Sequence, residues 1–157
     1  MDWQHRLREG VAALPFAVSE QAIGQMIEYL SLLLKWNGAF NLTAIRDPEQ
    51  MVLQHVMDSL VVHPHIQCER LLDVGTGAGL PGMILAMLSP QREHHLLDTN
   101  GKKVRFLKQV VHSLGLTHVH PIHARVESYR CAPFTQIISR AFSSISHMIE
   151  VSNHLLS

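Results

Sequence analysis

Three glycines at alternate positions follow Asp73, and this segment has the clearest chemical meaning in the sequence. Asp73 ends an apolar run, and a second apolar run begins after Pro81. This pattern predicts a buried parallel strand that turns sharply into a helix. Glycine at Gly75, Gly77 and Gly79 permits positive φ and a close approach of the backbone to a ligand. The segment therefore predicts a nucleotide-type cofactor loop in an α/β domain.

Two classes of cofactor use such a loop. The dinucleotide pattern G-x-G-x-x-G fits residues 77–82. An acid followed by G-x-G-x-G, the pattern of S-adenosylmethionine enzymes, fits residues 73–79. The second pattern also accounts for Asp73, because a carboxylate attracts a cationic sulfonium and repels a pyrophosphate. A tight turn that binds no ligand is a third interpretation.

Asp98 adds weight to a cofactor site. It ends a second predicted strand, about twenty residues after the glycines, where an acid can bind a ribose. A carboxylate can accept hydrogen bonds from both ribose hydroxyls at once. The alternative is an ordinary acid at the end of a strand.

Hydrophobic periodicity predicts helices first and then strand–helix alternation. Ser19 is the expected N-cap of a helix over residues 19–36, which a turn-rich connector follows. Asp47 and Pro48 begin another helix, whose apolar face is expected to hold Leu53 and Val61 together with Val52, Val56, Met57 and Leu60. Strands are predicted at 70–74, 93–98, 119–123 and 136–139, with helices at 82–88, 102–114 and 144–156.

The alternation predicts a doubly wound α/β fold with a mostly parallel sheet. Residues 1–66 are expected to form an N-terminal helical extension packed on a main domain at 67–157. At 157 residues, the chain can bury about two thirds of its unfolded surface. It contains 46% hydrophobic and 17% charged residues, has no apolar run long enough for a membrane span and has no signal-peptide pattern. The isolated Cys68 and Cys131 suggest reduced thiols in the cytoplasm.

Charge is distributed unevenly, although the formal net charge is zero. Residues 99–157 hold seven Lys/Arg and two Asp/Glu, which favours a polyanionic partner, with a solvated basic helix as the alternative. Four of these cations crowd one predicted helix: Lys102, Lys103, Arg105 and Lys108. The twelve histidines include no pair at ligand spacing within one helix, so no metal is expected.

A set of motifs in a fixed order resembles the RsmG family, also called GidB, of bacterial small-subunit rRNA guanine-N7 methyltransferases. The motifs are Trp36-Asn37 with Asn41-Leu42-Thr43, His55-x-x-Asp58-Ser59, the string from Asp73 to Gly82, Leu97-Asp98 with Lys102-Lys103 and Phe106-Leu107, and Ser139-Arg140-Ala141. The resemblance covers nearly the entire chain. It implies a class I methyltransferase fold, S-adenosylmethionine as the methyl donor and 16S rRNA of the small ribosomal subunit or its assembly intermediate as the partner of a cytoplasmic monomer.

The resemblance also assigns residues. Cofactor contacts are carried over to Gly75, Leu80, Asp98, Val126, Glu127 and Arg140, beside Asp73, Gly77 and Gly79 from the loop pattern. The expected wall of the catalytic site is His55, Asp58, Ser59 and Arg140, for which hydrogen bonding between the helix and the main domain is the alternative role. Gln54 stands where the family often has a basic residue. The resemblance also implies about three further strands, so the C-terminal part of the sheet is expected to be missing.

Two other functions fit parts of the sequence. An NAD-dependent oxidoreductase would explain the glycines, and an RNA- or ribosome-binding module with a vestigial pocket would explain the basic helix. Guanine N7 carries no proton, so its methylation needs no general base, and the lack of a Cys or Ser nucleophile constellation is consistent with that reaction.

The basic helix yields a prediction about RNA binding. Replacement of both Lys103 and Lys108 by Ala should reduce the slope of log affinity against log salt by about 0.7 to 0.9 per lost phosphate contact, because fewer counterions are released. Filter binding of 16S rRNA over a salt series measures this slope, and cofactor binding serves as the control. An unchanged slope would mean that this helix is only a solvated surface.

Overall fold

The computed structural model describes residues 2–140 and 143–157, which contain a four-stranded parallel sheet. The strand order is β3-β2-β1-β4, with all three pairings parallel. The strands are β1 (Arg70–Val74), β2 (Glu93–Asp98), β3 (Val119–His123) and β4 (Gln136–Ile138). The predicted α/β fold is therefore confirmed, and three of the four strands have the predicted bounds.

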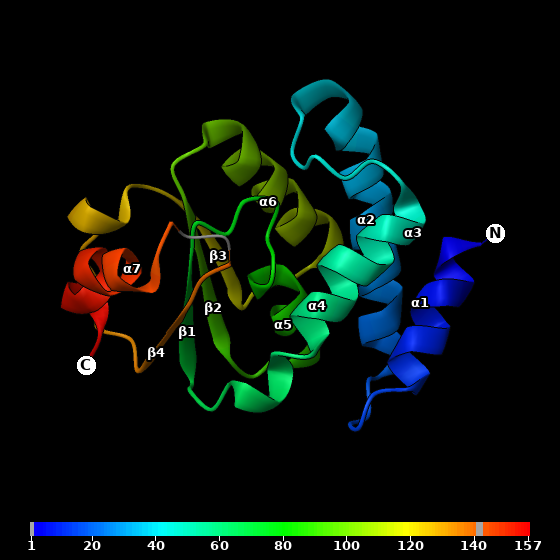
Figure 1. Cartoon of the computed structure of the whole chain (residues 1–157), viewed down its shortest axis with the longest axis horizontal. Coiled ribbons are helices and arrows are strands. Elements are labelled where there is room, and N and C mark those ends of the chain that lie inside the picture. The colour runs from blue at the N-terminus through cyan, green and yellow to red at the C-terminus, as the bar shows by residue number, and fades with distance from the viewer. Residues whose placement is uncertain (1, 141–142) are drawn as a thin grey trace.

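Helices cover both faces of the sheet (Figure 1). The crossover helices α5 (Gly82–Leu88) and α6 (Gly101–Leu114) lie on one face, and α7 (Ile145–Ser152) lies on the other. Parallel strands need such crossovers, and helices on both faces explain why consecutive residues are buried in β1 (Leu71 to Val74) and in β2 (Leu96 and Leu97). Three short 3-10 turns lie between these elements or after them: η2 (His63–His65), η3 (Val126–Ser128) and η4 (Asn153–Leu155).

The N-terminal helices form a further layer on the outside of α5 and α6 (Figure 1). They are α1 (Trp3–Ala12), α2 (Glu20–Phe40), α3 (Pro48–Met51), the π-helix η1 (Val52–Met57) and α4 (Asp58–Leu60). Tyr29 of α2 and Phe106 of α6 are fully buried, with ring centroids 6.1 Å apart. One apolar cluster runs from α1 through α2 to α5 and α6, so these helices share a core with the sheet domain.

Helix α2 begins as predicted, with the Ser19 hydroxyl accepting from the amide of Ala22, but it ends four residues later than residue 36. The expected connector is wrong over this stretch, because Trp36 and Phe40 pack together on the helix, with ring centroids 5.3 Å apart. The helix stops at Asn41, which takes the left-handed conformation with φ 51°. This longer helix carries the Asn37 side chain to the start of the next segment.

The helix after Asp47 also differs from the prediction. Leu53 and Val61 are 58% and 57% exposed, although ordinary helical spacing placed them on the buried face. The buried positions recur instead every four residues, at Met51-Val52, His55-Val56 and Ser59-Leu60. The wider turn of the π-helix, with i→i+5 hydrogen bonds, explains this shift of register. As a result, His55 and Ser59 face the interior of the protein.

Candidate active site

A cleft lies at the carboxyl ends of β1 and β2, where ligands bind in open α/β sheets. It has a volume of about 190 Å³. The strand ends and the turn after β3 supply its walls, which include Val74, Gly75, Leu97, Asp98, Val126 and Glu127. The cleft therefore brings together four of the predicted cofactor residues from three separate segments.

The glycines of the loop fall into two groups, those that are open to a ligand and those that pack against side chains. Gly75 and Gly77 have φ of 68° and 60°, and a Cβ atom on either would meet nothing within 4 Å. Gly79 and Gly82 instead lie against side chains: a Cβ on Gly79 would come within 2.8 Å of Leu107. The open side of Gly75 and Gly77 is thus available to a ligand, whereas Gly79 serves packing against α6.

Asp73 lies beneath the loop and does not line the cleft. Its Oδ2 accepts hydrogen bonds from the Thr76 hydroxyl at 2.8 Å and from the Gly82 amide at 2.9 Å. Burial raises the pKa of Asp73 to about 7, although these two hydrogen bonds and the charge of Arg140 act in the opposite direction. Its Oδ1 is buried without a hydrogen-bond partner. Asp73 therefore holds the two ends of the loop together.

Asp98 connects the loop to the neighbouring strand. Its Oδ2 accepts from the Gly77 amide and its Oδ1 from the Asn100 amide, both at 2.8 Å. Each carboxylate oxygen keeps a second lone pair, so the group can still accept hydrogen bonds from a ligand in the cleft. Asn100 in turn caps α6 by accepting from the amides of Lys102 and Lys103.

Arg140 and His55 meet across the gap between the end of β4 and the π-helix. Arg140 donates from Nη1 to the Gln54 carbonyl at 3.1 Å and from Nη2 toward His55 Nδ1 at 3.4 Å. A guanidinium cannot accept, so Nδ1 accepts and Nε2 carries the proton that reaches the Thr43 hydroxyl, 2.9 Å away. Burial, and then the charge of Arg140, lower the pKa of His55. His55 is therefore a neutral link between Arg140 and the N-terminal helices.

Other predicted residues lie outside this arrangement. The Ser59 hydroxyl donates back to the His55 carbonyl at 2.6 Å, so it serves the helix itself. Asp58 is exposed, and its charge raises the pKa of His55 slightly against the larger opposing effects. Leu80 is buried in the core. Ala141, the last residue of the Ser-Arg-Ala motif, is outside the described residues.

Several residues support the site although no sequence motif indicates a role for them. The Tyr29 hydroxyl donates to the Ala78 carbonyl at 2.7 Å and so braces the glycine loop from α2. The Ser139 hydroxyl donates to the Val74 carbonyl at 2.8 Å. Asn37 accepts from the Thr43 amide at 2.9 Å. Tyr29 has the same spacing as its apolar neighbours, so no pattern in the sequence separates it from an ordinary core residue.

Comparison with known proteins decides the family. The family model for rRNA small subunit methyltransferase G, GidB, matches residues 22–157. A relative of that name from Shewanella piezotolerans is 48% identical over 96% of this chain and 73% of its own length. Another, from Saccharophagus degradans, is 50% identical over 96% of this chain and 68% of its own length.

The chain belongs to the GidB family. The resemblance inferred from the motifs is confirmed, and the family sets aside the dinucleotide alternative. Solved structures agree at the level of fold: an O-methyltransferase from Bacillus cereus in complex with SAH has a TM-score of 0.59 and 19% identity, covering 99% of this chain and 69% of that one. A putative O-methyltransferase from Klebsiella pneumoniae has a TM-score of 0.60 and 18% identity, covering 99% and 68%.

The buried Asp73 carboxyl yields a prediction about stability and pH. Its pKa of about 7 in the folded state lies above the value of about 3.9 in an unfolded chain. The protonated Asp73 carboxyl therefore contributes stability that is complete below about pH 4. This contribution is lost as the pH rises from about 4 through about 7, by on the order of 1 kcal/mol per pH unit. Urea unfolding between pH 4.5 and 8 should show this component in the parent and not in Asp73→Asn.

The exposed acid Glu28 provides the control, because Glu28→Gln should leave the parent's profile unchanged. Subtracting each variant from the parent removes the histidine titrations that they share. If parent and Asp73→Asn have parallel profiles, the carboxyl does not titrate as described.

Proposed function

We propose that this protein is an S-adenosylmethionine-dependent methyltransferase that modifies N7 of a guanine in 16S rRNA of the small ribosomal subunit. The observation that carries the proposal is the open backbone of Gly75 and Gly77 beside the Asp98 carboxylate. Membership of the GidB family supports the rRNA substrate, and the motif resemblance supports guanine N7.

The residues of the cleft fit the proposed cofactor. Asp98 keeps acceptor capacity for ribose hydroxyls, and Val126 offers a buried apolar surface near the end of β3. The absence of a side chain on Gly75 leaves room for a ligand to lie over the end of β1. Bound S-adenosylmethionine would supply an electrophilic methyl group on a sulfonium.

Asp73 would act on that cation from below the loop. Its carboxylate form is disfavoured by burial, and a positive charge in the cleft would restore it, because opposite charges attract strongly where water is excluded. Arg140 is placed for an anion, and we assign it to a carboxylate of the cofactor or a phosphate of the RNA. The neutral His55 keeps Arg140 oriented without adding charge.

The proposed chemistry asks little of the protein beyond alignment. Guanine N7 has an in-plane lone pair and no proton, so neither His55 nor Asp58 has to act as a base. Correct alignment alone can lower the barrier by up to ~7–11 kcal/mol. A purine methylated at N7 gains positive charge, and the exposed Asp58 carboxylate is our candidate to stabilise it. This assignment requires the RNA to approach across the π-helix.

The RNA-binding surface is assigned to α6 and its surroundings. Lys102, Arg105 and Lys108 are exposed, whereas Val104 and Leu107 on the same helix are buried. The N-terminus of α6 follows directly from the end of β2, so these cations lie on the helix that starts beside the cleft. No described helix is both long and apolar enough for a membrane span, and the ribosomal substrate supports a cytoplasmic location.

Methyl transfer from a labelled donor to small ribosomal subunits that lack the modification tests the function. Label should appear as 7-methylguanosine after digestion of the 16S rRNA. Gly75→Val should lower the rate at least a hundredfold, because a β-branched residue is strained at a φ of 68° and its side chain would fill the open space that the cofactor needs.

Gly115→Val is the matched control. Gly115 also has a positive φ, of 65°, and a Cβ on it would meet nothing within 4 Å, but it is the C-cap of α6, away from the cleft. The control should transfer methyl groups like the parent. Label in another base or at another guanine atom would contradict the N7 assignment, and equal rates for Gly75→Val and the parent would contradict the cleft.

A further inference from the structure

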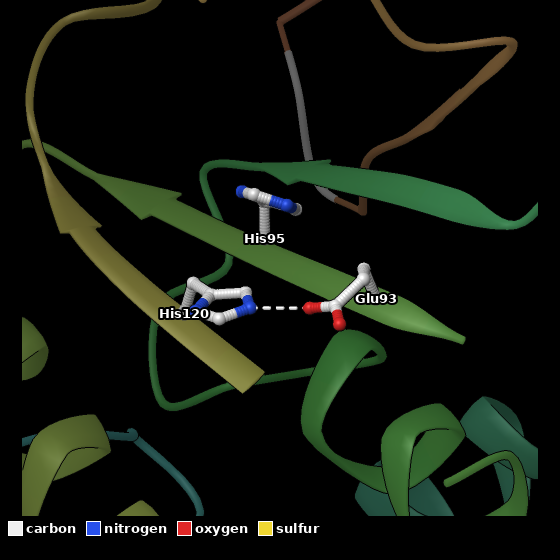
Figure 2. Close-up of side chains that lie close together, drawn as sticks. All are labelled: Glu93, His95 and His120. Atoms are coloured by element: carbon white, nitrogen blue, oxygen red, sulfur yellow. Dashed lines mark hydrogen bonds and ion pairs between the residues drawn. The ribbon is translucent and has the colours of Figure 1, made fainter. Parts of the chain in front are cut away.

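Glu93, His95 and His120 gather three metal-binding side chains on one face of the sheet (Figure 2). His95 of β2 and His120 of β3 are paired across the strands, and Glu93 lies two residues before His95 on the same strand. Side chains at positions i and i+2 of a strand share a face. One ligand atom from each residue lies within 4.8 Å of the others.

This cluster is separate from the cofactor cleft. Glu93 is the first residue of β2, whereas the cleft contains Asp98, the last residue of the same strand. The two sites therefore lie at opposite ends of the sheet. The cluster is also accessible, because the side chains of Glu93 and His120 are 48% and 44% exposed.

The donor set and its hydrogen bonds favour a cation. Nε2 of His120 pairs with a carboxylate oxygen of Glu93, as Figure 2 shows. Nδ1 of His95 is buried and has no hydrogen-bond partner, so the hydrogen bonds of the protein do not fix this ring. Two imidazoles and one carboxylate, with water in a fourth position, form a common coordination set for zinc.

We propose that Glu93, His95 and His120 bind a zinc ion that joins β2 to β3. Ligand atoms around a tetrahedral zinc lie about 3.4 Å apart, so side chains whose ligand atoms lie up to 4.8 Å apart need to close by up to about 1.4 Å. The ion would replace the proton shared by His120 and Glu93. No catalytic step is assigned to it, because its place in the fold is far from the proposed methyl transfer.

The charges around the cluster set the strength of this site. Glu93 attracts a cation, and Arg70 of β1 repels one. The Arg70 guanidinium lies over the Phe134 ring at 4.4 Å and donates to the carbonyls of Ala132 and Pro133. It is thus fixed in place and makes the site weaker than a closed structural zinc site.

The sequence predicts no metal when the criterion is ligand spacing within one helix. The cluster instead depends on strand alternation and on the β2–β3 register. A half-exposed His120–Glu93 pair without a metal would contribute little to stability. A zinc-dependent gain in stability therefore distinguishes a metal site from an ordinary surface ion pair.

Titration calorimetry with zinc chloride on the full chain at pH 7.5 tests the proposal. The parent should bind one zinc ion per chain at its strongest site, and His120→Gln, His95→Gln and Glu93→Gln should each weaken this binding at least about tenfold. His112→Gln removes an exposed histidine of α6 and is the matched control for weak binding by surface histidines. It should bind zinc like the parent.

Thermal unfolding with and without zinc gives a second measurement. Zinc should raise the Tm of the parent and of the control and should not raise the Tm of His120→Gln. The His120 side chain is half-exposed, so its replacement by Gln should leave the fold intact. If His120→Gln binds zinc as tightly as the parent, or if the parent shows no zinc-dependent rise in Tm, the proposal is wrong. Neither result bears on methyl transfer.

Discussion

The hydrogen bonds from Thr76 and Gly82 to the buried Asp73 carboxylate are the interaction on which the proposed active site depends. They draw the end of β1 and the start of α5 together, and so fix the path of the loop between them. A Cβ on Gly82 would contact Leu96 and come within 2.7 Å of Asp73 Oδ2, so only glycine permits this contact. The cost is a buried carboxyl whose pKa is raised to about 7. Asp73, which the sequence motif suggests as a partner for a cation, therefore fixes the backbone of the glycine loop in the first place.

The loop, held in this path, forms hydrogen bonds with the neighbouring elements β2 and α2. The Gly77 amide of the loop donates to the Asp98 carboxylate, and the Ala78 carbonyl accepts from the Tyr29 hydroxyl. A second chain of contacts runs from Asn37 and Thr43 through His55 to Arg140. The N-terminal helices therefore orient both the loop and Arg140, which explains why family motifs occur in these helices as well as in the sheet domain.

The elements with strong local signals could be predicted from the sequence. Strands β1, β2 and β3 and helix α5 have the predicted bounds, because buried parallel strands and glycine turns leave clear patterns. The π-helix at Val52–Met57 could not, because its apolar residues also fit ordinary helical spacing. Asn37 and Gly38 suggested a connector, but tertiary packing of Trp36 and Phe40 extended α2 through them.

In the candidate site, too, some features could be predicted from local sequence patterns and others depend on tertiary packing. Gly75, Asp98, Val126 and Glu127 line one cleft, as a shared cofactor role requires. The sequence motif could not show that Ser59 bonds to its own helix, or that Gly79 faces Leu107, because both facts depend on packing between distant segments. The roles of these residues in binding and catalysis stay predictions.

The cofactor preference of the folded chain tests the central claim most directly. Thermal unfolding should be followed with S-adenosylhomocysteine, S-adenosylmethionine and NAD, each at the same concentrations. A ligand that binds only the native state raises Tm by mass action, by roughly 5–10 °C at a hundredfold excess over Kd for a chain of this length. The account predicts such a rise with both adenosyl compounds and none with NAD. A rise with NAD alone would contradict it.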